Sequence, residues 1–168
     1  MWGVSSAKMI KTLISDLSYV LLFPVDKTYD GKINTLYTET SGGINFKFID
    51  FFRLNTDLLE FYKSLKIKGM KLYIFTEGSI QNDPEIKQKL DDVFVKGYSV
   101  DQVGFAKSDV ESYRRLLQMI GIEPSQVMYV DDKAENIEAA SEAGLQAILY
   151  KNNEEVIGEV NKLLEGNV

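Results

Sequence analysis

The chain has 168 residues, of which 45% are hydrophobic and 26% charged, and its formal net charge is −6. It contains neither cysteine nor histidine, which excludes disulfides, thiolate metal sites, the commonest general base and the commonest transition-metal ligand. A metal site or acid–base chemistry must therefore use carboxylates, lysine, tyrosine, hydroxyls or water. Carboxylates favour a hard cation such as Mg²⁺. The acidic charge argues against binding to a nucleic-acid backbone.

The length favours one compact domain, residues 1–168. No apolar run approaches the ~18 residues that cross a bilayer, so we expect no membrane partner. Residues 1–10 lack a long apolar core and a cleavage signal, and this pattern predicts a loosely ordered lead-in rather than a signal peptide. A cytoplasmic location is consistent with these features.

The first half of the chain has an irregular pattern. Short apolar runs at 13–14 and 20–23 flank a turn around Asp16. Residues 32–40 lie between two glycine-containing turn signals, which predicts a hairpin arm. The strongly aromatic segment 46–52 predicts a short helix or wedge that packs against the core or a second subunit.

A helix capped by Asn55 or Thr56 is expected to follow and to reach Leu65. Residues 18–52 then form a flap or short insert. Asp16 and Thr76 lie 60 residues apart. The flap and the helix use most of that length, so little chain remains for a separate lid domain.

The second half alternates strand and helix patterns, which predicts parallel strands joined by right-handed crossovers. Asp83 suits the N-cap of a helix with Pro84 in its first position, and Ser108 to Glu111 has the spacing of a capping box. Glycines at 121 and 144 should end two helices. The expected strands are 72–75, 95–100, 127–130 and 145–150, and the expected helices are 84–93, 108–120, 133–143 and 153–164.

Polar residues follow three of the apolar, strand-like runs. They are Asp16, Thr76 and the pair Asp131–Asp132. In an open parallel α/β sheet the ligand crevice lies outside the carboxyl ends of the strands. We therefore expect these side chains to face one cavity, although they are far apart in the sequence.

Two further segments complete a set of four motifs: 104–113 (GFAKSDVESY) and 127–144 (VMYVDDKAENIEAASEAG). With the segments around Asp16 and Thr76, their order and spacing resemble the haloacid dehalogenase-like (HAD) phosphohydrolase superfamily, in the branch with an Asp-Asp fourth motif. The resemblance covers about residues 11–150. It implies a three-layer α/β fold, a doubly wound parallel sheet of Rossmannoid type, with a minimal cap or none.

The resemblance also implies roles for single residues. Asp16 matches the nucleophile that forms an aspartyl-phosphate, and Lys107 matches the lysine that neutralises the phosphoryl group. Thr76 matches the hydroxyl that binds phosphoryl oxygens, with Glu77 and Gly78 beside the substrate. The resemblance also implies that Mg²⁺ is bound by Asp16, Asp132 and the main-chain carbonyl of Ser18. Asp131 and Asn136 would support this metal site.

Ser18 departs from the family pattern, because the family has a second acid two residues after the nucleophile. That acid protonates the leaving group and then activates water. Proton transfer of this kind is worth about 10²–10⁴-fold in rate. The resemblance therefore implies a slow Mg²⁺-dependent phosphohydrolase that acts on a phosphomonoester. It also implies that Ser18 lies among the residues that bind the substrate.

Two other functions remain open at this point. The first is a catalytically impaired domain that binds metal, phosphate or a protein partner, which Ser18 favours. The second is a dehalogenase or phosphonatase, which the Asp-Asp motif and the short insert disfavour. The open site would admit a phosphorylated small molecule or a phosphoprotein, or would be closed by another copy in a homo-oligomer.

Overall fold

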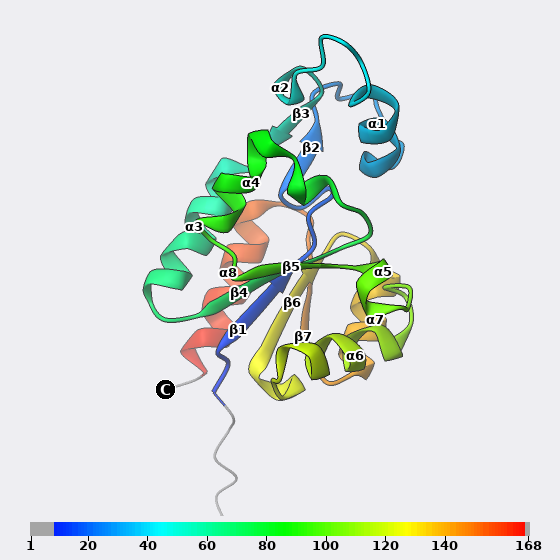
Figure 1. Cartoon of the computed structure of the whole chain (residues 1–168). Coiled ribbons are helices and arrows are strands. Elements are labelled where there is room, and N and C mark those ends of the chain that lie inside the picture. The colour runs from blue at the N-terminus through cyan, green and yellow to red at the C-terminus, as the bar shows by residue number, and fades with distance from the viewer. Residues whose placement is uncertain (1–8, 167–168) are drawn as a thin grey trace, which may run out of the picture.

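The computed structural model describes residues 9–166. Its centre is a five-stranded sheet in the order β5-β4-β1-β6-β7, in which every neighbouring pair is parallel (Figure 1). The strand order reverses on either side of β1, because β4 and β6 are both its neighbours. Such a point is where an open α/β sheet binds its ligand. The strands are β1 Thr12–Ser15, β4 Lys71–Thr76, β5 Lys96–Ser99, β6 Val127–Asp131 and β7 Gln146–Leu149.

Helices cover both faces of the sheet, so the fold has the three layers, helices, sheet and helices, that the sequence predicted (Figure 1). One face packs against α3, α4 and α8, and the other against α5, α6 and α7. Successive strand residues alternate between these two cores: Leu13 belongs to the first and Ile14 to the second. The helices are α3 Thr56–Ile67, α4 Pro84–Asp91, α5 Val100–Val103, α6 Val110–Ile120, α7 Ala134–Glu142 and α8 Asn153–Glu165, with 3₁₀ turns η1 Ile80–Asn82 and η2 Pro124–Gln126.

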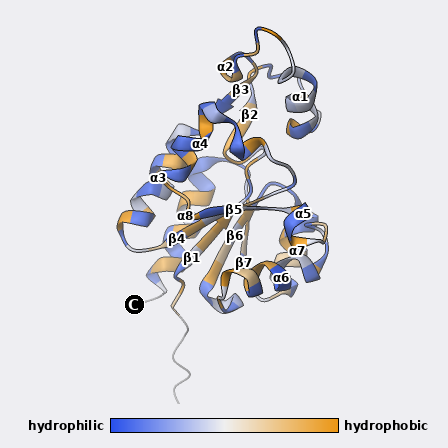
Figure 2. Cartoon of the chain, viewed as in Figure 1, coloured by the Kyte–Doolittle hydropathy of each residue, from blue (hydrophilic) through white to orange (hydrophobic). Residues whose placement is uncertain are grey.

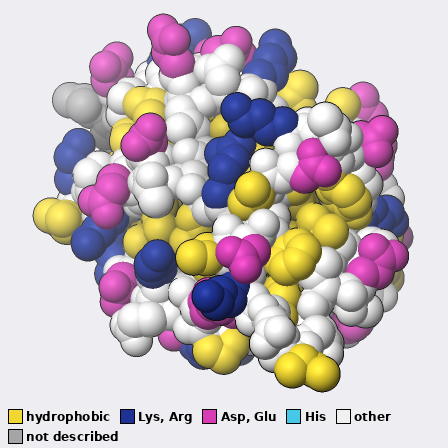
Figure 3. Space-filling model, turned by 90° about the horizontal axis from the view of Figure 1, so that it is seen from above, with side chains coloured by type: hydrophobic (Ala, Val, Ile, Leu, Met, Phe, Trp, Pro, Cys, Tyr) yellow, Lys and Arg dark blue, Asp and Glu magenta, His cyan; other side chains and the backbone are white. Residues whose placement is uncertain are grey.

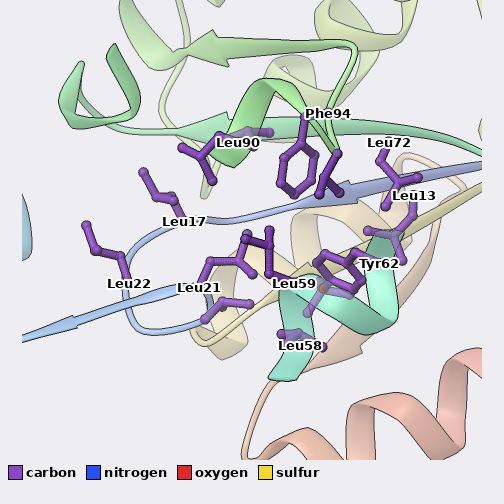
Figure 4. Close-up of a cluster of buried hydrophobic side chains, with 14 of the residues drawn as sticks. Leu13, Leu17, Leu21, Leu22, Leu58, Leu59, Tyr62, Leu72, Leu90 and Phe94 are labelled. Atoms are coloured by element: carbon purple, nitrogen blue, oxygen red, sulfur yellow. The ribbon is translucent and has the colours of Figure 1, made fainter. Parts of the chain in front are cut away.

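The strands are apolar along most of their length, whereas the helices show one apolar and one polar face (Figure 2). The larger core gathers leucines from β1, α3 and α4 around the fully buried Tyr62, as Figure 4 shows. Ile10 joins this core, whereas residues 1–8 of the expected lead-in lie outside the described residues. Among residues 9–166, no helix is long and apolar enough to cross a membrane.

Most of the α-helices begin at a residue whose side chain caps the first turn. Asn55 caps α3 and Asp83 caps α4, as predicted. The predicted Ser108–Glu111 capping box was wrong. Asp109 caps α6 instead, accepting from the backbone N–H of Glu111, because a carboxylate one residue later reaches the same free donors. A complete capping box is found at α5, between Ser99 and Gln102.

Between β1 and α3 lies a small insert, residues 22–54. The strands β2 Leu22–Pro24 and β3 Phe52–Leu54 pair antiparallel and carry helices α1 Ile33–Thr40 and α2 Phe48–Phe51 at their far end (Figure 1). The predicted hairpin arm at 32–40 was therefore wrong, since this segment is α1. Its apolar residues Ile33, Leu36 and Tyr37 have helical spacing and pack against the core, which overrides the flanking turn signals.

Candidate active site

Three strand ends bring the candidate residues together. Asp16 directly follows β1, Thr76 ends β4 and Asp131 ends β6, and β1 lies between the other two strands. Lys107 reaches the same place from the loop between α5 and α6. One carboxylate oxygen from each of Asp16, Asp131 and Asp132 lies within 4.8 Å of the others. The convergence expected from the strand ends is thus present for the three carboxylates.

Lys107 is buried at the centre of this group, with 3% of its surface exposed. Its Nζ lies 2.8 Å from Oδ1 of Asp16 and 2.7 Å from Oδ2 of Asp131. The rings of Phe75 and Tyr129 lie 5.4 and 5.9 Å from the ammonium. Burial alone would lower the pKa of Lys107, but the two carboxylates raise it above its ordinary value. The side chain therefore stays charged.

Asp131 is fully occupied by donors. Its Oδ2 accepts from the Tyr129 hydroxyl at 2.5 Å as well as from Lys107. Its Oδ1 accepts from the backbone N–H of Lys133 at 2.9 Å and from Nδ2 of Asn136 at 3.0 Å. Burial would raise the pKa of Asp131, but Lys107 and these hydrogen bonds hold it below its ordinary value. A carboxylate with four donors on its two oxygens is suited to positioning Lys107 rather than to binding a further ligand.

Asp16 and Asp132 have free oxygens instead. Oδ1 of Asp16 accepts from the Leu17 N–H at 2.7 Å and from Lys107, whereas Oδ2 accepts no hydrogen bond from residues 9–166. No other residue in this range donates to the carboxylate of Asp132. Burial raises the pKa of Asp16 to about 7, with Asp131 adding to the rise and Lys107 opposing it. Burial and Asp131 also raise the pKa of Asp132.

This cluster fits a hard divalent cation. Three carboxylates lie around the one buried ammonium, that of Lys107, so the cluster has an excess of negative charge whenever all three are ionised. Such repulsion is unfavourable unless a counter-ion relieves it. The donors are all oxygen atoms, as Mg²⁺ prefers, and the free oxygens of Asp16 and Asp132 are the ones available to it.

A cavity of about 380 Å³ opens over the free carboxylates, a size that suits a small ligand. The Ser18 hydroxyl lines it and is buried, yet within the described residues it has no hydrogen-bond partner, and the same holds for the buried Thr76 hydroxyl nearby. Buried hydroxyls are normally paired, so the Ser18 hydroxyl is suited to a bound ligand, whereas Thr76 is fully buried and does not line this cavity. The cavity is lined by Asp16, Ser18, Tyr19, Asp30, Gly31, Lys32, Ile33, Asn34, Glu77, Asp132, Lys133 and Asn136.

The remaining expected residues lie further out. Glu77 is exposed at the rim, where its Oε1 lies 3.4 Å from Nζ of Lys133. Gly78 lines a neighbouring cavity of about 550 Å³ between α4 and β5. A Cβ on Gly78 would lie only 2.5 Å from Oδ1 of Asn34, so glycine lets the first turn of α1 approach this loop closely.

The insert is held against the body at several points. The Tyr37 hydroxyl donates to Oδ2 of Asp83 at 2.8 Å, and the Phe48 N–H donates to Oε1 of Glu85 at 3.0 Å. The Tyr19 hydroxyl donates to the carbonyl of Gly31 at 2.6 Å. Figure 3 looks down on this end of the molecule and shows hydrophobic side chains interspersed with charges of both signs. Because these hydrogen bonds hold the insert against the body, the insert forms a fixed wall of the cavity.

Sequence reasoning missed several residues of the site, among them Tyr129, Lys133 and Asn34. Tyr129 lies two positions before Asp131 on the same face of β6, a strand period that could have revealed it. Lys133 directly follows the paired aspartates and lines the cavity. Asn34 comes from the helix predicted as a hairpin arm, so its position could not be inferred from the sequence pattern.

Comparison with known proteins identifies related chains. A family model described as haloacid dehalogenase-like hydrolase matches residues 23–144, a range that begins after Asp16. Enolase-phosphatase E1 of Enterobacter sp. (strain 638) is 31% identical over 100 residues, covering 57% of this chain and 43% of that protein. The enzyme of the same name from Aquifex aeolicus (strain VF5) is 28% identical over 100 residues, covering 56% and 44%. The chain spans less than half the length of these curated relatives.

Solved structures share the fold. A HAD family enzyme from Bacteroides thetaiotaomicron superimposes with a TM-score of 0.67 at 17% identity, covering 91% of this chain and 99% of that one. The same wild-type enzyme in complex with magnesium and inorganic phosphate gives a TM-score of 0.63 at 18% identity, covering 84% and 94%. At these identities the likeness establishes the architecture alone.

Proposed function

The chain belongs to the haloacid dehalogenase-like hydrolases, and on that premise we propose that it is a Mg²⁺-dependent phosphohydrolase in which Asp16 takes the phosphoryl group from a phosphomonoester. The observation that carries this proposal is the state of Asp16. Its Oδ1 is fixed by Leu17 and Lys107, while its Oδ2 is unengaged by residues 9–166, at the wall of the cavity. A fixed carboxylate with one free oxygen is suited to nucleophilic attack on phosphorus.

The other residues of the site would act on charge and orientation. Lys107 offsets the negative charge that accumulates when a carboxylate approaches a phosphate, and Asp131 holds Lys107 in place. The Thr76 and Ser18 hydroxyls can donate to phosphoryl oxygens. Asp16, Asp132 and the Ser18 main-chain carbonyl would hold the metal. When bound, Mg²⁺ would supply the remaining positive charge that lets the two anions meet.

The names of similar proteins support this proposal. The curated relatives are enolase-phosphatases, and the Bacteroides thetaiotaomicron enzyme is described in complex with magnesium and inorganic phosphate. The substrate need not be shared, because the chain covers less than half of those relatives. The cavity accepts a phosphorylated small molecule, and its open rim also accepts a side chain of a phosphoprotein.

A phosphate-release assay tests the proposal. The protein with Mg²⁺ and p-nitrophenyl phosphate should release phosphate slowly, chelation of the metal should stop the release, and Asp16→Asn should abolish it. Asp57→Asn, the same chemical change on the exposed surface of α3, should behave as wild type. Release that persists in Asp16→Asn would assign the nucleophile to another residue.

A second candidate function is a binding module without turnover, which Ser18 favours. A serine hydroxyl has no useful acid or base strength near neutral pH. Such a module would bind Mg²⁺ together with a phosphate mimic such as beryllium fluoride, yet would form no phosphoenzyme with any donor. Calorimetric binding without covalent labelling would favour this function over hydrolysis.

A further inference from the structure

Three proton donors near Asp16 are already committed. The ammonium of Lys107 is held between two carboxylates, and the Tyr129 hydroxyl donates to Asp131. On the cavity side, the Tyr19 hydroxyl donates to the Gly31 carbonyl. None of these groups can give a proton to a departing oxygen without breaking a contact that shapes the site.

The carboxylates that line the cavity offer no replacement. Asp16 and Asp132 must be ionised to serve as nucleophile and metal ligand. Asp30 and Glu77 are exposed at the rim, and Glu77 is paired with Lys133. The group closest along the chain to Asp16 that faces the cavity is the buried, unpartnered hydroxyl of Ser18, which can donate a hydrogen bond but not a proton. The other cationic group on the lining besides Lys133 is Lys32, which is exposed at the rim. No buried acid is therefore positioned beside Asp16 to protonate a leaving group, which departs as an anion.

Leaving groups differ greatly in how easily they depart as anions, because they differ in basicity. An alkoxide is about as basic as hydroxide, whose conjugate acid has a pKa of about 15.7. A carboxylate has a conjugate acid with a pKa of about 4 and leaves without a proton. An acyl phosphate, a mixed anhydride of a carboxylic and a phosphoric acid, has such a leaving group.

The free energy of the phosphorylated enzyme also favours an acyl phosphate as the phosphoryl donor. Phosphorylated Asp16 is itself an acyl phosphate, so transfer from another acyl phosphate exchanges one mixed anhydride for another and is close to thermoneutral. Transfer from an alkyl phosphate makes an anhydride from an ester and runs uphill. A fast second step could draw that reaction forward, but water attack on phosphorylated Asp16 also lacks a carboxylate base at Ser18.

Resting on the function proposed above, we propose that the preferred phosphoryl donor of this site is an acyl phosphate. Oδ2 of Asp16 forms a bond to phosphorus as the bond between phosphorus and the acyl oxygen breaks, and the carboxylate departs with the electron pair. No proton moves in this step. Phosphorylated Asp16 then persists until water or another acceptor takes the phosphoryl group.

Acetyl phosphate and ethyl phosphate make a matched pair of probes, since both are small and differ in the leaving group. The full chain with Mg²⁺ is mixed with each, and phosphorylated protein is followed by intact mass and by its sensitivity to hydroxylamine. Acetyl phosphate should label the protein at least about 10²-fold faster than ethyl phosphate, the low end of what a missing acid is worth. Asp16→Asn sets the background for labelling elsewhere.

Two Ser18 variants separate the effect of the site from the greater intrinsic reactivity of acetyl phosphate. Ser18→Asp should raise labelling by ethyl phosphate relative to labelling by acetyl phosphate, so that the ratio of the two rates falls. Ser18→Asn, of equal size but without an acid, should keep the wild-type ratio. Equal labelling by both donors, or a ratio that Ser18→Asp leaves unchanged, would overturn the inference while the labelling itself upholds the proposed function. No labelling by these donors or by p-nitrophenyl phosphate would overturn both.

Discussion

The two halves of the cavity are built differently. The inner half comes from the ends of the central strands, and two of its charged groups are saturated: Asp131 is fully buried with four donors, and Lys107 is 3% exposed between two carboxylates. The outer half comes from the insert and the rim. Its Ser18 hydroxyl and Asn34 amide make no hydrogen bond within residues 9–166, and Asp30 and Lys32 are exposed.

The difference separates two tasks. The inner half keeps charges in fixed positions where water is excluded, which is what stabilising a transferring phosphoryl group requires. The outer half leaves its polar groups available, which suits recognition of the part of the substrate that departs. Substitutions should therefore be costly for stability in the inner half, and should change reactivity more than stability in the outer half.

The largest effect is expected from Asp131→Asn. The change leaves Lys107 and Tyr129 facing a neutral amide, and removing one partner of a buried ion pair costs about 3–5 kcal/mol. Because Asp16 still pairs with Lys107, we expect the lower end, about 3 kcal/mol, and a melting temperature lower by roughly 10 °C. Thermal and urea unfolding without metal would measure it.

The neighbouring Asp132→Asn is the matched control for that experiment. Residues 9–166 offer the Asp132 carboxylate no donor from another residue, and its charge repels Asp131. Without metal, this variant should be as stable as the wild type or slightly more stable. A loss equal to that of Asp131→Asn would contradict the distinction between a saturated and an open carboxylate.

The second prediction concerns Mg²⁺. A ligand of the folded state stabilises it by about 2.7 kcal/mol at a concentration 100 times its Kd, so Mg²⁺ should raise the melting temperature of the wild type. Asp132→Asn should lose this rise. Asp30→Asn, which changes a rim carboxylate outside the three-carboxylate cluster, should retain it. A rise that survives in Asp132→Asn would place the metal elsewhere.

The inner half of the cavity was predictable because each of its strand-end residues directly follows or ends an apolar run in the sequence. Polar residues after apolar strands of a parallel sheet lie at one edge, and this brought Asp16 and Asp131 together, with Thr76 at the end of the neighbouring strand β4. The pattern does not reveal which aspartate is saturated. That depends on the Tyr129 hydroxyl and the Asn136 amide, whose reach is set by packing in three dimensions.

The outer half was less predictable for a physical reason. Residues 32–40 carry turn signals on both sides and β-branched residues within, yet they form α1 because Ile33, Leu36 and Tyr37 find apolar partners on one side. Tertiary packing overrode the local preference. Asn34 lies over Gly78 because it belongs to the first turn of α1. Its position could therefore not be predicted from a sequence pattern that did not indicate this helix.

The third prediction concerns turnover. Ser18→Asp should raise the steady-state hydrolysis of alkyl phosphates at least about tenfold, because a carboxyl group can both protonate the leaving oxygen and activate water. The lifetime of phosphorylated Asp16 should shorten in the same variant. Ser18→Asn, which adds no acid, should give neither gain. A folded, Mg²⁺-binding Ser18→Asp protein without any gain would favour the binding module.

The smallest effect is expected where the insert meets the loop after β4. Gly78→Ala would place a Cβ 2.5 Å from Oδ1 of Asn34, so the amide must move, but it is the end of a flexible side chain. We expect a loss of about 1 kcal/mol or less in unfolding free energy. In an Asn34→Ala background the obstacle is gone, and replacing glycine by alanine should then be neutral or stabilising by about 0.4–1 kcal/mol, because the unfolded chain loses freedom.

The coupling between these two positions, measured by urea unfolding of the four proteins in a double-mutant cycle, should be at least about 0.5 kcal/mol. Additive effects would mean that α1 does not rest on Gly78 in solution, and that the outer wall of the cavity is not fixed there. A coupling of the expected sign would show that close approach of the insert, and not a special backbone conformation, is the reason for glycine at this position. This contact in the outer half would then be one that a flexible side chain can adjust, whereas the buried ion pairs of the inner half cannot move without losing a partner.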